Sequence, residues 1–77
     1  MATYHFDYRD SGKLITDYVG TPLDSFEEAK VEAVRALAQL AKDELQGPER
    51  RQLAIEIRAE NDPVLQVVLT LEVKPLI

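Results

Sequence analysis

A single amphipathic stretch with its own start and stop signals divides this chain into two halves of alternating pattern. Ser25 and Glu28 match a capping box, in which the hydroxyl accepts from a backbone amide and the carboxylate reaches back. Gly47-Pro48 supplies a stop, because glycine takes a left-handed turn and proline cannot continue a helix. Between these signals, apolar side chains recur at helical spacing: Ala29, Ala33, Leu37, Leu40 and Ala41. The sequence therefore predicts one helix over residues 26–46.

The segment before the helix has the pattern of a hairpin. Residues 3–9 alternate aromatic and polar side chains, which is typical of a half-buried strand. Asp10-Ser11-Gly12 then predicts a turn, because aspartate bonds its own backbone and glycine accepts a positive φ. An extended pattern resumes over residues 13–18, and Gly20-Thr21-Pro22 breaks it before the helix.

The segment after the helix predicts a second hairpin. A polar link at 49–52 leads to alternating runs at 53–59 and 64–73, with a turn at 60–63 between them. The run at 64–73 is so apolar that we expect it inside the sheet, because an apolar edge strand invites association.

The order strand-strand-helix-strand-strand predicts an α+β fold. Seventy-seven residues hold one domain, and we expect it to span residues 1–77 with an ordered core at about 3–73. Because an isolated hairpin is only marginally stable in water, the two hairpins are expected to merge. The result is a two-layer sandwich of β-β-α-β-β order, with one helix packed on a mostly antiparallel four-stranded sheet.

The charge balance and the absence of cysteine exclude several functions. Nine Lys and Arg against 14 Asp and Glu give a net charge of −5, and no basic cluster is present, which argues against nucleic-acid binding. Without cysteine there are no disulfides and no thiolate metal sites, and a small domain without disulfides favours the cytoplasm. The sequence contains no run of about 18 apolar residues, so we expect no membrane-spanning segment. We expect no cofactor and no bound metal.

His5 is the single imidazole, and it defines the catalytic hypothesis. It lies on the polar side of the first strand and could serve as a general base or a metal ligand. Asp7, Asp10 and Asp17 crowd around the same hairpin, where we expect turn-forming, solvated carboxylates. No nucleophile elbow or metal-binding helix motif accompanies them, so a small enzyme or ligand-binding accessory using His5 is the alternative reading rather than the first.

A binding or self-association module is the function that the pattern favours. One helix covers one face of such a sheet, and the other face stays mostly polar. Val68 lies on this open face, and three further apolar residues have no obvious core position. Together they form the expected interaction surface: Val68, Val19, Leu76 and Ile77. A second copy of the chain or another protein is the expected partner.

Several short motifs carry a resemblance to a known group of proteins. They are Tyr4-x-Phe6, Asp10-x-Gly12, Asp17-x-x-Gly20, the capped helix with Ala29, Glu32-Ala33 and Leu37, and the closing strands Ile55-x-Ile57 and Val67-x-Leu69-x-Leu71. Together they resemble a small bacterial domain-of-unknown-function family that is common in rhizobia and related alphaproteobacteria. The resemblance implies a fold of this order and a bacterial origin, and it transfers no activity and no catalytic residue.

Overall fold

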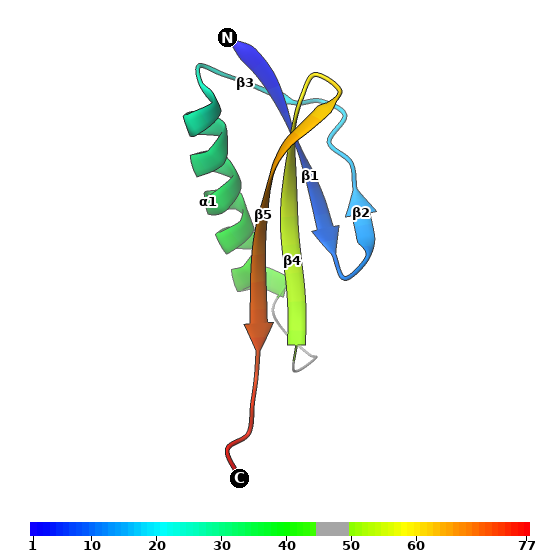
Figure 1. Cartoon of the computed structure of the whole chain (residues 1–77), viewed down its shortest axis with the longest axis vertical. Coiled ribbons are helices and arrows are strands. Elements are labelled where there is room, and N and C mark those ends of the chain that lie inside the picture. The colour runs from blue at the N-terminus through cyan, green and yellow to red at the C-terminus, as the bar shows by residue number, and fades with distance from the viewer. Residues whose placement is uncertain (45–49) are drawn as a thin grey trace.

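The computed structural model describes residues 1–44 and 50–77, which form one helix and an open antiparallel sheet (Figure 1). The elements in chain order are β1 (Ala2–Asp10), β2 (Lys13–Ile15), β3 (Thr21–Leu23), α1 (Phe26–Glu44), β4 (Arg50–Ala59) and β5 (Asp62–Glu72). The predicted α+β class, with a helix packed on a sheet, is confirmed.

The start of α1 follows the predicted capping chemistry. The amide of Glu28 donates to Ser25 Oγ at 3.2 Å, and the Glu28 carboxylate accepts from the amide of Asp24 at 3.1 Å. The described helix ends at Glu44, and the predicted stop at 47–48 lies outside the described residues. Within residues 1–44 and 50–77, no helix has both the length and the apolar character that a bilayer crossing requires.

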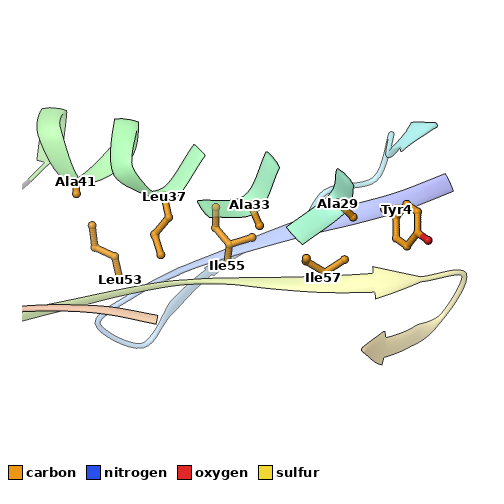
Figure 2. Close-up of a cluster of buried hydrophobic side chains, with 8 residues drawn as sticks. All are labelled: Tyr4, Ala29, Ala33, Leu37, Ala41, Leu53, Ile55 and Ile57. Carbon is orange, nitrogen blue, oxygen red and sulfur yellow. The ribbon is translucent and has the colours of Figure 1, made fainter. Parts of the chain in front are cut away.

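The core is a single layer of side chains between α1 and the sheet (Figure 2). Alanines on the buried stripe of α1 bring the helix close to β4, which supplies the branched side chains of the core. The members are Tyr4, Ala29, Ala33, Leu37, Ala41, Leu53, Ile55 and Ile57. The central strand β4 lies between β1 and β5, and its Ala54, on the opposite face, is also buried.

The sheet has five strands rather than the predicted four. Its order is β2-β1-β4-β5, and β3 pairs with the other half of the edge where β2 lies. The expected extended run at 13–18 ends at Ile15, and the segment expected only to break the hairpin forms β3. The reason is that β1 is long: β2 pairs with its residues 8–10, and residues 2–4 remain available for β3.

The position of β5 corrects another prediction. The apolar run at 64–73 was expected inside the sheet, and the structure places β5 at its edge. The two neighbours of the central strand are β1 and β5, and the hairpin β4–β5 therefore leaves β5 outermost. The predicted link at 49–52 is also shorter than expected, because β4 begins at Arg50.

Candidate functional site

The outer edge of β1 is completed by a carboxylate. Between the stretches paired with β3 and β2, the Phe6 amide donates to Asp17 Oδ2 at 3.0 Å. The other oxygen, Asp17 Oδ1, accepts from the amides of Val19 at 3.1 Å and Gly20 at 3.0 Å. Asp17 thus provides the hydrogen-bond acceptor that a partner strand would otherwise provide to β1. The same carboxylate also fixes the conformation of the β2–β3 connection.

Asp7 lies beneath this connection and forms an ion pair with Arg58. The Arg58 guanidinium donates from Nε to Asp7 Oδ2 at 2.6 Å and from Nη2 to Oδ1 at 3.2 Å. The amide of Asp17 also donates to Asp7 Oδ1 at 2.9 Å, and Arg58 Nη2 donates to the Asp17 carbonyl at 3.0 Å. The expectation that Asp7 is solvated is wrong: the residue is 6% exposed, because the connection folds over it.

The electrostatics of this polar cluster keep its acids ionised. The Arg58 hydrogen bonds lower the pKa of Asp7 despite the burial that opposes this. Burial raises the pKa of Asp17, but the backbone amides of Gly20, Phe6 and Val19 together outweigh it, so the net pKa is lowered. Arg51 likewise lowers the pKa of Asp10. These carboxylates therefore act as fixed acceptors rather than as proton donors near neutral pH.

His5 is held against the same connection. Its Nδ1 lies 3.0 Å from the Asp17 carbonyl oxygen, which can only accept, so Nδ1 carries a proton and donates it. Gly20 packs on this ring with φ +79°: a Cβ there would lie 2.9 Å from His5 Cε1 and 2.7 Å from Thr3 Cγ2. Only glycine satisfies both the backbone angle and this close approach.

A shallow hollow of about 530 Å³ begins at His5 and runs to the β4–β5 turn. It is lined by Met1, Ala2, Thr3, His5, Ala59, Glu60, Asp62 and Val64. Within residues 1–44 and 50–77, no group of three or more His, Cys, Asp or Glu side chains is placed to hold a metal ion. Asp7 and Asp17, the acids of the polar cluster, are already engaged by backbone amides and Arg58.

The opposite edge of the sheet, formed by β5, is apolar and exposed. Val68 is 47% exposed on the open face, and Leu71 is 37% exposed on the helix face. Among the described residues, no strand pairs with the outer side of β5. Protection is limited to the two ends of β5. A shift of register next to Ile57 and the proline at 63 disturb the ladder at one end, and Glu72 with Lys74 places charge at the other.

The hydrogen-bonding phase of the sheet can be traced from Asp17 to β5. Because the Phe6 amide donates to Asp17, the main chain of Phe6 faces away from β4 and from its partner Ile57. Phe6 and Ile57 are therefore a non-hydrogen-bonded pair, in which both residues face away from each other, so Ile57 faces β5 and its partner Leu65 faces back toward β4. Because neighbouring residues of a strand turn their N–H and C=O groups to opposite sides, the residues of β5 that turn these groups outward include Gln66, Val68 and Thr70.

An apolar hollow of about 210 Å³ lies beside this edge, between α1 and β5. Val34, Leu37 and Ala38 of α1 line it, together with residues 67–69 of β5. Val34 is half exposed although it lies on the flank of the buried stripe. The helix therefore leaves a space next to β5 that one more strand, with apolar side chains on the helix face, could fill.

The structure separates the four residues of the expected interaction surface. Val68 lies in the middle of β5, whereas Val19 lies in the β2–β3 connection, beside the other edge of the sheet. Leu76 and Ile77 follow β5 in the C-terminal segment and are exposed (Figure 1). The surface centred on Val68 also includes Val34 and Ala38, which sequence reasoning missed. The valine at 34, on the margin of an otherwise alanine-rich stripe, was the available signal.

The polar cluster was also missed, although Asp17-x-x-Gly20 carried a signal for it. An aspartate two or three residues before a glycine is typical of a turn in which the carboxylate accepts from backbone amides. Arg58 could not be assigned to Asp7 from sequence, because 51 positions separate them and only the register of β1 on β4 brings them together.

Comparison with known proteins gives a match to a family model. The family model described as "Domain of unknown function (DUF6894)" matches residues 3–70, which is most of the chain. Neither the search of curated proteins nor the search of solved structures finds a match.

Proposed function

The chain belongs to the DUF6894 family of domains of unknown function, and we propose that it is a protein-interaction module that binds an extended strand along the outer edge of β5. The observation that carries the proposal is the contrast between this edge and the rest of the surface. An eleven-residue edge strand has half-exposed apolar side chains on both faces and outward-turned backbone groups at its centre.

An added strand would bond with the outward-turned backbone groups of β5 and cover its exposed apolar side chains. Soluble proteins commonly protect an edge with charge, proline or a bulge, and here residues 64–71 of β5 contain no charged side chain. An added strand supplies main-chain hydrogen bonds for affinity, and its alternate side chains enter pockets that give specificity. The hollow between α1 and β5 is such a pocket.

The alternative, a small enzyme or accessory domain that uses His5, has less support. The Nδ1–H bond to Asp17 orients the ring beside the hollow at the β4–β5 turn, as a general base requires. Asp7 and Asp17 have lowered pKa values and structural partners, so these two acids are not available as a proton-donating companion.

Two finer expectations belong to this proposal. The absence of cysteine supports a reducing compartment, and we place the module in the cytoplasm. The resemblance to a family that is common in rhizobia and related alphaproteobacteria supports a bacterial origin.

The test uses a fluorescently labelled peptide with the sequence of residues 64–72 as a strand probe. We expect saturable binding by the full chain, measured as fluorescence anisotropy. The variant Val68→Lys should weaken binding at least tenfold, because it puts a charge at the centre of the apolar edge. The matched control is Val19→Lys, which makes the same change at an exposed position beside the other edge. Equal affinity for both variants, with native circular dichroism, would overturn the proposal.

A further inference from the structure

We propose that the strand bound by β5 is the β5 of a second copy, paired antiparallel about a two-fold axis through Val68. This inference rests on the proposed function and names its partner. In this arrangement two five-stranded sheets join into one continuous sheet, and both α1 helices lie on the same face of it.

The side-chain pattern of β5 is palindromic about Val68. Two-fold antiparallel pairing places residue 68 opposite itself, 67 opposite 69, 66 opposite 70 and 65 opposite 71. Apolar residues then meet apolar residues on the helix face, and the Gln66 amide meets the Thr70 hydroxyl on the open face. The same pair of side-chain types already bonds within the chain, where Gln52 Nε2 donates to Thr70 Oγ1 at 3.3 Å. An axis at residue 67 would instead place Gln66 opposite Val68.

The directions in which the residues of β5 turn their N–H and C=O groups agree with this axis. Val68 turns its N–H and C=O outward, so two copies of Val68 can exchange both bonds directly. Gln66 and Thr70 turn outward as well, and each meets the other across the axis in the same bonded geometry.

Charge and shape are also compatible with a second copy. Each chain carries a net charge of −5, yet the paired residues 65–71 contain no charged side chain, so no like charges are placed directly opposite one another. The side chains of Val67 and Leu69 from one copy project on the helix face, toward the hollow lined by Val34 and Ala38 of the other.

The experiment relies on the absence of cysteine from the native chain. Single substitutions Val68→Cys, Gln66→Cys and Thr70→Cys are oxidised under native conditions, and covalent dimers are measured on denaturing gels. Across the axis the two Cα atoms at position 68 lie about 5.5 Å apart, within disulfide reach. Two copies of residue 70 lie about 14 Å apart, beyond that reach.

We expect Val68→Cys to form a dimer by itself, at least tenfold faster than Thr70→Cys or Gln66→Cys alone. An equimolar mixture of Gln66→Cys and Thr70→Cys should cross-link as a heterodimer. Val19→Cys is the control for random collision, since it is exposed beside the opposite edge. Light scattering on the wild-type chain should show a concentration-dependent dimer that Val68→Lys dissociates.

The outcomes separate this inference from the proposed function. If the chain stays monomeric, or if Thr70→Cys cross-links with itself as fast as Val68→Cys, the two-fold partner is wrong. Binding of the strand probe to the edge would then still support a module for another protein. If the probe also fails to distinguish Val68→Lys from Val19→Lys, both proposals are overturned.

Discussion

The outer edges of β1 and β5 belong to one sheet, but they differ in whether other parts of the chain pair with them. At the β1 edge two short strands pair with the two ends of β1, and the Asp17 carboxylate takes the backbone amide between them. At the β5 edge the described residues supply no partner strand, and apolar side chains are half exposed. The difference is that the β1 edge is closed by partners from its own chain, whereas the β5 edge is open, and it supports the proposal that the β5 edge binds another strand.

The two edges also differ in the kind of interaction that they use. Polar contacts close the β1 edge: ionised aspartates accept from backbone amides and from Arg58. The centre of the β5 edge, residues 65–71, has no ionisable side chain. Perturbations of charge should therefore act mainly on the first edge and leave the second edge intact.

Low pH should produce the largest effect on stability in this comparison, because it protonates three carboxylates at once, whereas the centre of the β5 edge has none. The pKa values of Asp7, Asp10 and Asp17 are lowered in the fold from the ordinary value of 3.8. Below about pH 4 the unfolded chain therefore binds more protons than the folded chain, and stability falls as pH falls. We expect the free energy of unfolding, from urea titrations, to be level between pH 5 and 7 for these groups and to decline below pH 4.

A matched pair of variants tests whether Asp7 contributes to this decline in stability. Asp7→Asn removes one of the lowered carboxylates and should flatten the acid limb, whereas Asp43→Asn, at an exposed position on α1, should leave its slope unchanged. Equal slopes for the two variants would contradict the role given to Asp7.

Removing the Asp17 carboxylate should open the β1 edge directly. Asp17→Ala leaves three backbone amides without their acceptor, at about 1 kcal/mol for each, so we expect a loss of about 3 kcal/mol. Amide hydrogen exchange at Phe6 should accelerate more than at the neighbouring residues of β1. Asp17→Asn retains one acceptor oxygen and should lose less, and an unchanged exchange rate at Phe6 in Asp17→Ala would argue against a closed edge.

Two glycines give the smallest and most specific comparison. Gly12 and Gly20 both have positive φ, +89° and +79°, but only Gly20 packs closely on His5 and Thr3. Gly12→Ala should cost about 1 kcal/mol from the backbone angle alone. Gly20→Ala adds a steric clash and should cost about 2 kcal/mol. Thermal unfolding measures both, and equal losses would mean that His5 and Thr3 move aside without cost.

Local signals in the sequence were sufficient for the helix and the three long strands, but not for the short strands β2 and β3. The capping residues Ser25 and Glu28 set the helix start, because capping depends on atoms within a few positions of one another. Alternation in 3–9, 53–59 and 64–73 identified three strands and the faces that they bury, because side chains alternate along any strand. The same alternation placed Val68 on the face opposite the helix, and the residue is half exposed there.

Only the tertiary structure decided which strands lie at the edges and which charges are buried. Strand order depends on pairings between distant segments, and the alternation of β5 is the same whether it lies inside the sheet or outside it. The burial of Asp7 likewise depends on a connection that folds back across β1 and on Arg58 from the other half of the chain. Local sequence therefore determined the faces of the strands, which follow from backbone geometry. Their neighbours followed from long-range packing, and the open edge of β5 is a consequence of that packing.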